Sequence, residues 1–289
     1  MSDAEARSPL HNRVARRLRL MAVLAHPDDE SLGVGGTLAK YAAEGVEVVL
    51  LTATRGDSGR FRGYRQGDQQ HPGPADLATI RETELRAAAS ALGVRDVSLL
   101  DYRDQHLDGA NPREAVGLIV KHVRRVRPEV VVTFGPDGAY GHPDHIAISQ
   151  FTTAAIVAAA DPTFAYDGIE AMRPHVVSKL YYLAWPEATC KAYQAAFRTL
   201  VSTVDGVQRQ AVPWPEWAIT TVIDTRSYWP TVWRAISCHD SQVAAYDRLR
   251  HLSPEDHAAL WGRQFFYRAF SIVSGGRAQE TDLMEGLRT

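Results

Sequence analysis

Two short segments of the chain carry side chains that can hold a metal ion and move protons. The first is HPDDE over residues 26–30, and the second is GPDGAYGHPDH over residues 135–145. Imidazoles and carboxylates are the ligands of many hydrolytic zinc sites, which keep one position open for water. Neither segment is specific alone, but together they predict a metal site, and such a site predicts hydrolysis.

Both segments directly follow apolar runs that read as buried strands. LRLMAVLA precedes the first segment, and VVVTF precedes the second. Pro27 cannot donate a ladder hydrogen bond, so the first strand should end beside it. Open α/β sheets bind ligands at the carboxyl ends of their strands. Because adjacent parallel strands bring such ends together, we expect the two segments to form one site.

The residue types allow a division of labour between metal binding and proton transfer. His26, Asp29 and His145 can supply a His-Asp-His ligand set. Zinc is the expected metal, and N and O ligands also suit Fe²⁺. Metal coordination lowers the pKa of water from about 15.7 to about 7, and Asp28 can then act as the general base.

The second segment also offers groups for stabilising an oxyanion. His142, if protonated, can stabilise the oxyanion of a tetrahedral intermediate. Asp144 is expected to hold His142 charged and oriented, as carboxylates near metal sites do. Tyr140 can donate a hydrogen bond to the same oxygen. The second segment is therefore predicted to complete an amide-hydrolysing site.

Strand and helix signals alternate along the first half of the chain. The patterns predict strands over 18–25, 46–52, 97–100 and 130–134, and helices over 32–43, 75–92, 112–126 and 143–160. This order is typical of βαβ units and a mostly parallel sheet flanked by helices. The apolar runs lack alternation, as strands covered on both faces do. The predicted fold class is therefore α/β.

The second half is less regular. It predicts strands over 179–185, 217–223 and 265–273, and helices over 188–200, 228–237 and 255–261. We expect a polar tail over 1–17 and one domain over 18–289, with a core over 18–160 and an α+β extension over 161–289 that walls the cleft. The long loop over 55–74 should lie on the same rim as the first segment.

Composition excludes several classes of protein. The 289 residues carry a formal net charge of -2, so no global basic field points to nucleic acid. The isolated Cys190 and Cys238 signal neither a cysteine zinc site nor a disulfide framework. No apolar window approaches the roughly 20 residues of a membrane span, and the N-terminal stretch lacks a signal-peptide cleavage pattern. We expect a cytoplasmic protein, and the sequence does not decide whether the protein forms a homo-oligomer.

The segments AHPDDESLGVGGTLA and GPDGAYGHPDH resemble the PIG-L/LmbE-like family of zinc-dependent N-deacetylases. That family includes deacetylases of N-acetylglucosamine conjugates and amidases of mycothiol conjugates. The resemblance covers residues 1–160 well, and beyond them only fragments such as SCHDSQ over 237–242. It implies a Rossmann-like fold and a small N-acetylated sugar conjugate as substrate.

The resemblance also implies a role for individual residues. It assigns the metal ligands as His26, Asp29 and His145, the base as Asp28, the electrophilic catalyst as His142 and the assisting group as Tyr140. More loosely, Arg81 in IRETEL matches a substrate-reaching arginine, and Asp104 in DYRD matches an acid that binds sugar hydroxyls. Asp57 stands where a glutamate is commoner in the family.

Three other functions are weighed against deacetylation. An amidase that cleaves a larger acyl group would use the same residues, so only substrate turnover separates the two. A nucleotide-binding Rossmann module is disfavoured because GVGG is not G-x-G-x-x-G and the preceding acids would repel a pyrophosphate. A non-catalytic sugar-binding relative should have lost a ligand or the base, yet all four candidates are present.

Overall fold

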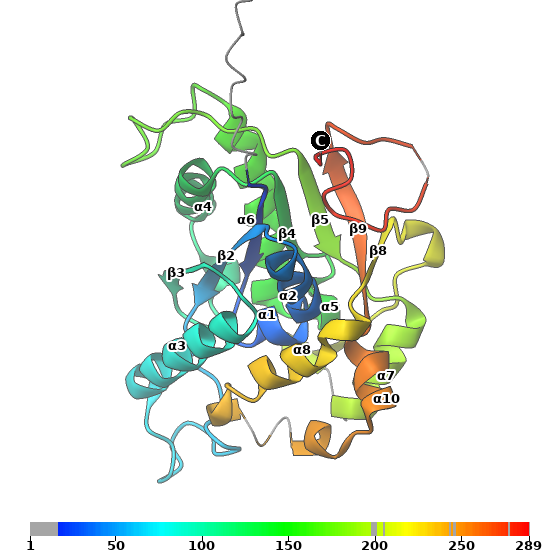
Figure 1. Ribbon diagram of the computed structural model, residues 1–289. Helices are drawn as coiled ribbons and strands as arrows, with labels where there is room; N and C mark the ends of the chain where they lie inside the picture. Colours follow the sequence, from blue (N-terminus) through cyan, green and yellow to red (C-terminus); the bar gives the residue numbers. More distant parts are fainter. Residues whose placement is uncertain are drawn as a thin grey trace, which may run out of the picture.

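A seven-stranded sheet in the order β3-β2-β1-β4-β5-β9-β8 forms the centre of the molecule (Figure 1). The computed structural model describes residues 17–197, 201–204, 206–242, 244, 247–276 and 278–288. The strands are β1 (Arg19–Leu24), β2 (Glu47–Thr54), β3 (Asp96–Tyr102), β4 (Val130–Phe134), β5 (Lys179–Leu183), β8 (Thr221–Asp224) and β9 (Arg263–Ser271). The first five are parallel, whereas β9 and β8 add in antiparallel orientation.

The strand order creates a switch point between β1 and β4. From β1 the chain moves outward through β2 and β3, and it then returns to place β4 on the other side of β1. In the parallel register, Leu24 of β1 lies beside Thr52, and Ala22 lies beside Val132. Ligands of open α/β sheets bind where the strand order reverses in this way. The two segments predicted to form one site therefore follow neighbouring strands.

Helices cover both faces of the parallel strands, as the apolar runs predicted. The first-half helices are α1 (Asp29–Leu32), α2 (Gly35–Ala43), α3 (Pro74–Ala91), α4 (Pro112–Val126), α5 (Gly138–Gly141) and α6 (Pro143–Ala160). Helices α4 and α6 pack together, while α2 and α3 both contact α8 (Trp229–Ile236). Every residue of β4 is buried. The predicted α/β class, with a mostly parallel sheet flanked by helices, is confirmed.

Local signals set several boundaries. Asn111 caps α4, its side-chain oxygen accepting from the backbone N–H of Arg113 at 2.9 Å, and Pro112 takes the first helical position. The single helix predicted over 32–43 is instead two helices, α1 and α2. At Gly36, an added Cβ would lie 2.8 Å from the side chain of Thr225, so α2 approaches that residue closely.

The second half extends the sheet and adds shorter elements. These are α7 (Glu187–Phe197), α10 (Pro254–Trp261), the hairpin β6 (Val201–Val204) and β7 (Val207–Gln210), and the 3₁₀ turns η1 (Leu107–Gly109), η2 (Glu216–Ala218), η3 (Arg226–Tyr228), η4 (Asp240–Gln242) and η5 (Asp247–His251). The strand predicted over 217–223 begins only at Thr221, where pairing with β9 begins. The 3₁₀ turn η2 lies where the prediction placed the start of that strand. The hairpin was not predicted. The predicted tail, apart from residue 17, and residues 198–200 of a predicted helix lie outside the described residues.

A buried carboxylate fixes the C-terminal segment to the sheet. Glu280 is 1% exposed and accepts hydrogen bonds from Lys179 of β5 at 2.8 Å, Tyr181 at 2.6 Å and Thr221 at 3.0 Å. Arg268 of β9 forms a further ion pair at 2.8 Å. The chain end is thereby tied to three strands. Among the described residues, no helix combines the length and apolar character needed to cross a bilayer.

Candidate active site

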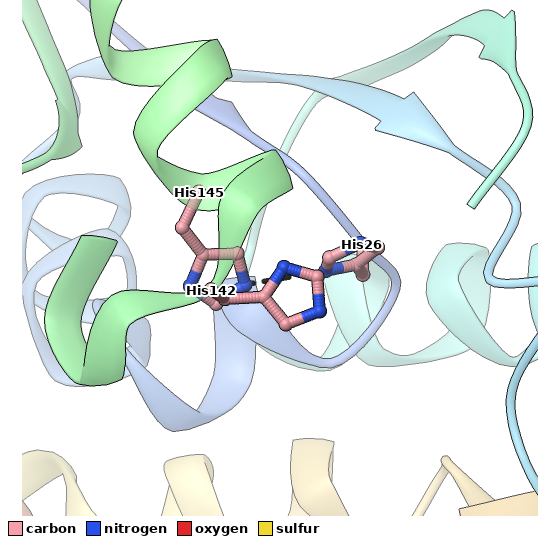
Figure 2. Close-up of side chains that lie close together, drawn as sticks. All are labelled: His26, His142 and His145. Carbon is pink, nitrogen blue, oxygen red and sulfur yellow. Dashed lines mark hydrogen bonds between the residues drawn. The ribbon is translucent and has the colours of Figure 1, made fainter. Parts of the chain in front are cut away.

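The two predicted segments meet at the carboxyl ends of β1 and β4. Figure 2 shows the rings of His26, His142 and His145 lying together, His26 from the turn after β1 and the other two from the start of α6. The ring centroids of His26 and His142 are 4.8 Å apart, and those of His142 and His145 are 4.7 Å apart. Phe134 at the end of β4 stacks on His145 with centroids 3.9 Å apart. The switch point therefore carries a compact imidazole cluster.

Potential ligand atoms of His26, Asp29 and His145 lie close to one another. Nδ1 of His26 lies 3.2 Å from Nε2 of His145, and that Nε2 lies 3.4 Å from Oδ1 of Asp29. Oδ2 of Asp29 lies 3.7 Å from Nδ1 of His26. The ligands of a tetrahedral zinc ion with bonds of about 2.0–2.1 Å are separated by about 3.3 Å. Asp29 thus turns one oxygen toward each histidine, and the chemistry of these donors, imidazole nitrogens and a carboxylate, fits a metal ion.

Two carboxylates determine which nitrogen of His26 faces the other donors. Nε2 of His26 lies 3.0 Å from Asp104 and 3.1 Å from Asp144. An ionised carboxylate can only accept hydrogen bonds, so Nε2 carries a proton, and in the neutral ring Nδ1 is the nitrogen that has the lone pair. Backbone N–H groups of Gln105 and Leu107 hold the Asp144 carboxylate at 2.7 and 3.0 Å. This is the arrangement by which carboxylates orient metal-binding histidines.

Burial and mutual charge perturb the pKa values of these donors. Burial raises the pKa of Asp29 to about 7, against the opposing effect of His26. Burial disfavours a charged His26, but hydrogen bonds and charge from Asp104 and Asp144 outweigh it and raise its pKa well above the usual value. Burial, reinforced by His26, holds the pKa of His145 well below its usual range. A neutral His145 with an available lone pair suits metal ligation.

Asp144 does not contact His142 in the way that the sequence predicted. Its carboxylate contacts His26, while the Asp144 backbone N–H donates to Nδ1 of His142 at 3.2 Å. His142 is thus the N-cap of α6. Because Nδ1 accepts a hydrogen bond, neutral His142 must carry its proton on Nε2. Burial, together with the charge on His26, lowers the pKa of His142 to about 4, which favours the neutral ring, and the catalytic role of His142 stays a prediction.

Two further groupings of donors could be considered for a metal. His26, His142 and His145 offer ligand atoms within 4.8 Å of one another, as do His26, Asp104 and Asp144. The proton on Nε2 of His142 disfavours the first grouping. The second grouping would use Nε2 of His26, which carries a proton. It would also use the carboxylate of Asp144, which already accepts hydrogen bonds from two backbone N–H groups. The predicted set of His26, Asp29 and His145 stays a prediction beside these two groupings.

Asp28 adjoins this set in an unusual backbone conformation. Its φ of 98° and ψ of -25° lie in the left-handed region, which few non-glycine residues adopt. Its carboxylate accepts from Nη2 of Arg81 at 3.1 Å, and its backbone N–H donates to Oε2 of Glu30 at 2.9 Å. Contacts on both sides of the residue therefore stabilise a conformation that is otherwise unfavourable.

The three residues expected to bind substrate lie close to the site but also contact the protein itself. Arg81 is 4% exposed and donates to the carbonyl oxygens of Pro27 and, at 2.9 Å, Gly56. Asp104 contacts His26, and the pKa of its carboxyl is lowered to about 2 because hydrogen bonding and charge from His26 outweigh burial. Asp57 accepts from the Asp104 backbone N–H at 3.0 Å. A substrate-contacting role for each of them stays a prediction.

Tyr140 lies beside both histidines of the second segment. Its ring is 5.9 Å from that of His142 and 5.3 Å from that of His145, both in edge-on geometry. Burial, followed by the charge of Asp29, raises its pKa, so the phenol keeps its proton. The preceding Ala139 has a φ of 64°, which shows how tightly the chain turns here. Tyr140 therefore keeps a hydroxyl proton that it can donate, and its assisting role stays a prediction.

A second buried ion pair beside the site was not predicted. Nε2 of His239 lies 2.8 Å from Oε1 of Glu30, and both side chains are essentially inaccessible to solvent. The two residues are 209 positions apart in the chain. The fragment SCHDSQ drew attention to His239, but no local pattern connects it with Glu30, the last residue of HPDDE.

Comparison with known proteins agrees with this geometry. The model of the PIG-L family, GlcNAc-PI de-N-acetylase, matches residues 21–156. A 1D-myo-inositol 2-acetamido-2-deoxy-alpha-D-glucopyranoside deacetylase from Kineococcus radiotolerans is 35% identical over 93% of this chain and 83% of its own length. The residues matched by the family model include both segments of the site.

Solved structures show the same fold. The N,N'-diacetylchitobiose deacetylase from Pyrococcus horikoshii aligns with a TM-score of 0.66 at 21% identity, over 90% of this chain and 86% of its own. The 4-carboxy-2-hydroxymuconate hydratase GalB from Pseudomonas putida KT2440 aligns with a TM-score of 0.66 at 18% identity, over 90% and 100%. Since these two proteins carry different activities, the fold alone does not determine the chemistry.

A mostly parallel α/β sheet with histidines and carboxylates clustered at its switch point agrees with the class of metal-dependent hydrolases. Within that class, the chain belongs to the PIG-L family of de-N-acetylases. It is an N-deacetylase, a hydrolase acting on amide bonds, as the resemblance implied.

Proposed function

We propose that this enzyme removes the acetyl group from a conjugate of N-acetylglucosamine, and that 1D-myo-inositol 2-acetamido-2-deoxy-alpha-D-glucopyranoside is the first substrate to test. That compound is named for the Kineococcus relative, which matches 93% of this chain. The observation that carries the proposal is the meeting of the His-Asp-His set with Asp28 and His142 at one strand switch point.

His26, Asp29 and His145 are the residues proposed to hold the metal, Zn²⁺ or Fe²⁺. Three short distances support this assignment. Nδ1 of His26 lies 3.2 Å from Nε2 of His145, and the two oxygens of Asp29 lie 3.4 Å from that Nε2 and 3.7 Å from that Nδ1. When bound, the ion would supply Lewis acidity, which polarises the acetyl carbonyl and favours deprotonation of water at neutral pH. Asp104 and Asp144 would keep His26 oriented through its Nε2–H.

Asp28 is proposed to accept the proton of the attacking water and pass it to the departing amine. A general base must be ionised and within hydrogen-bond reach of the proton it removes. The guanidinium of Arg81 lies 3.1 Å from Oδ2 of Asp28 and holds that carboxylate in place. Asp28 is also next to Asp29 in the chain, so it stays beside the proposed metal ligands.

His142 and Tyr140 are proposed to stabilise the negative charge that forms on the carbonyl oxygen. Both are neutral donors, His142 through Nε2–H and Tyr140 through its hydroxyl. Donors that are already oriented stabilise an oxyanion without reorganisation during the reaction. The N-cap bond that fixes His142 to α6 supports such preorganisation.

Acetate release and metal content, measured on the same samples, test this function. Wild type should release acetate and hold metal near stoichiometry. Asp29→Ala should lose both, whereas Asp28→Asn should keep the metal and lose about 10²–10⁴-fold in kcat. Asp108→Asn is a matched control, because Asp108 is an exposed carboxylate in the 3₁₀ turn η1. Turnover confined to larger acyl groups would contradict the proposed deacetylation, and a metal-free, inactive wild type would contradict the whole mechanism.

A further inference from the structure

The fully buried pair of Glu30 and His239 has no role in the function proposed above. Glu30 is 0% exposed and His239 is 1% exposed. Burying two ionisable groups is unfavourable unless each is paired and hydrogen-bonded. Oε1 of Glu30 receives the His239 contact at 2.8 Å and the Ser31 hydroxyl at 2.5 Å. The other oxygen, Oε2, remains for a different partner.

That partner is the backbone of Asp28. The Asp28 N–H donates to Oε2 of Glu30 at 2.9 Å. Asp28 holds a φ of 98°, a conformation that L-residues rarely adopt, so contacts of this kind are needed to maintain it. The direction in which the Asp28 side chain leaves the backbone depends on this φ. His239 therefore acts on Asp28 through Glu30, although the two are 211 positions apart.

The segment over residues 239–242 is itself fixed to the first half of the chain. The backbone N–H and hydroxyl of Ser241 each donate to Glu84 of α3 at 2.6 Å. The amide of Gln242 donates to the carbonyl oxygen of Arg60 at 2.7 Å, and the Arg62 N–H donates to the Ser241 carbonyl at 2.6 Å. His239 thus approaches Glu30 from a segment that α3 and the loop over 55–74 hold in place.

We infer that His239 is a positioning residue for the proposed reaction, and that its hydrogen bond to Glu30 keeps Asp28 in the left-handed conformation that aims its carboxylate. The inference rests on the proposed role of Asp28 as base. It assigns to the C-terminal half a part in catalysis that is distinct from substrate selection.

A matched pair of variants separates the hydrogen bond from the packing. His239→Gln keeps an amide donor near the position of Nε2, whereas His239→Met fills a similar volume without a donor. In the metal-loaded enzyme we expect His239→Met to lose about tenfold or more in kcat with KM changed by less than about threefold, and His239→Gln to recover most of that loss. His257→Ala, a buried histidine packed against Trp229, Trp233 and Trp261, controls for disturbance of the C-terminal half.

Crystal structures of the same proteins provide a readout that does not depend on activity. Asp28 should keep a positive φ in wild type and His239→Gln, and leave it in His239→Met. An unchanged φ in His239→Met, or equal kcat values for the two variants, would overturn the inference. If His239→Met does not fold, His239→Asn replaces it, because its amide is one methylene too short to reach Glu30 in the same way.

The two proposals fail in different ways. If wild type releases no acetate but the φ of Asp28 depends on residue 239, the proposed function is wrong and the positioning contact stands. If wild type releases acetate and His239→Met changes neither kcat nor φ, the function stands and the positioning role is wrong.

Discussion

Asp104 Oδ1 lies 3.0 Å from Nε2 of His26, on the side of the imidazole ring away from His145. The sequence suggested that Asp104 binds sugar hydroxyls, and the structure gives its carboxylate a direct contact with a proposed metal ligand. The other oxygen, Oδ2, accepts from the backbone N–H of Ser58 at 3.3 Å. The contact with His26 leads to the first prediction.

Asp104→Ala should weaken metal binding about 10–100-fold, which is the usual effect of removing a carboxylate that orients a ligating histidine. Asp104→Asn should weaken it less, because the amide oxygen can still accept from His26. Zn²⁺ titration of the metal-free proteins measures both affinities. Asp108→Asn is the control. Equal affinities in Asp104→Ala and wild type would contradict a role in orienting His26.

A second prediction concerns the space that Gly56 leaves for Arg81. A Cβ at Gly56 would lie 2.1 Å from Nη1 of Arg81, and the φ of Gly56 is 67°. Gly56→Ala must therefore displace the guanidinium that contacts Asp28. We expect a lower free energy of unfolding and a kcat reduced by about tenfold or more, measured by urea unfolding and acetate release.

Gly45→Ala is the matched control for this prediction. Gly45 has a φ of 83°, and no neighbouring atom lies within 4 Å of its added Cβ. This variant should lose about 1–2 kcal/mol from the left-handed conformation alone, with kcat unchanged. If Gly56→Ala shows the same loss of stability and full activity, the position of Arg81 does not matter to the reaction.

The parts of the site that the sequence predicts are those that follow strands. HPDDE and GPDGAYGHPDH each adjoin an apolar run, so the rule for parallel strand ends brings them together. The sequence does not predict which atom contacts which, because those contacts depend on the directions of side chains within turns. Asp144 is an example, since its carboxylate reaches His26 while its backbone reaches His142. No spacing rule separates those two outcomes.

Two further differences have identifiable causes. Between the residues of β6 and β7 the sequence reads Asp-Gly, which is a recognised hairpin signal, although no hairpin was predicted there. Gly206 has the positive φ that such a turn requires. By contrast, the Glu30–His239 pair joins residues 209 positions apart, and a single sequence contains no local signal for such a contact.

The third prediction concerns acid stability and Glu280. Burial alone would raise the pKa of this carboxyl, but hydrogen bonds from Lys179, Tyr181, Ser274 and Arg268 outweigh it and lower the pKa to about 2. A pKa lower in the folded than in the unfolded chain contributes stability above the unfolded value, here 4.5, and that stability is lost as pH falls toward 2. The contribution is about 3 kcal/mol at neutral pH.

Urea unfolding of wild type and Glu280→Gln at several pH values measures this contribution. The stability difference between them should be constant above about pH 5 and should shrink between pH 4.5 and pH 2. Glu187→Gln, which alters an exposed helical ion pair with Lys191, should change stability little at any pH. A difference for Glu280→Gln that does not depend on pH would mean that its charge is unimportant to folding.

The final prediction concerns removal of the metal. His26, Asp29 and His145 are buried and converge in the folded protein only, so an ion that binds them stabilises the folded state by mass action. At a free concentration 100 times its Kd, the ion should add about 2.7 kcal/mol to the free energy of unfolding. Calorimetry should therefore show a melting temperature that falls after chelation and rises again with added Zn²⁺. Asp29→Ala should abolish this dependence, whereas Asp108→Asn should preserve it. A full Zn²⁺-dependent shift in Asp29→Ala would place the ion elsewhere, most simply between His26 and the carboxylates of Asp104 and Asp144.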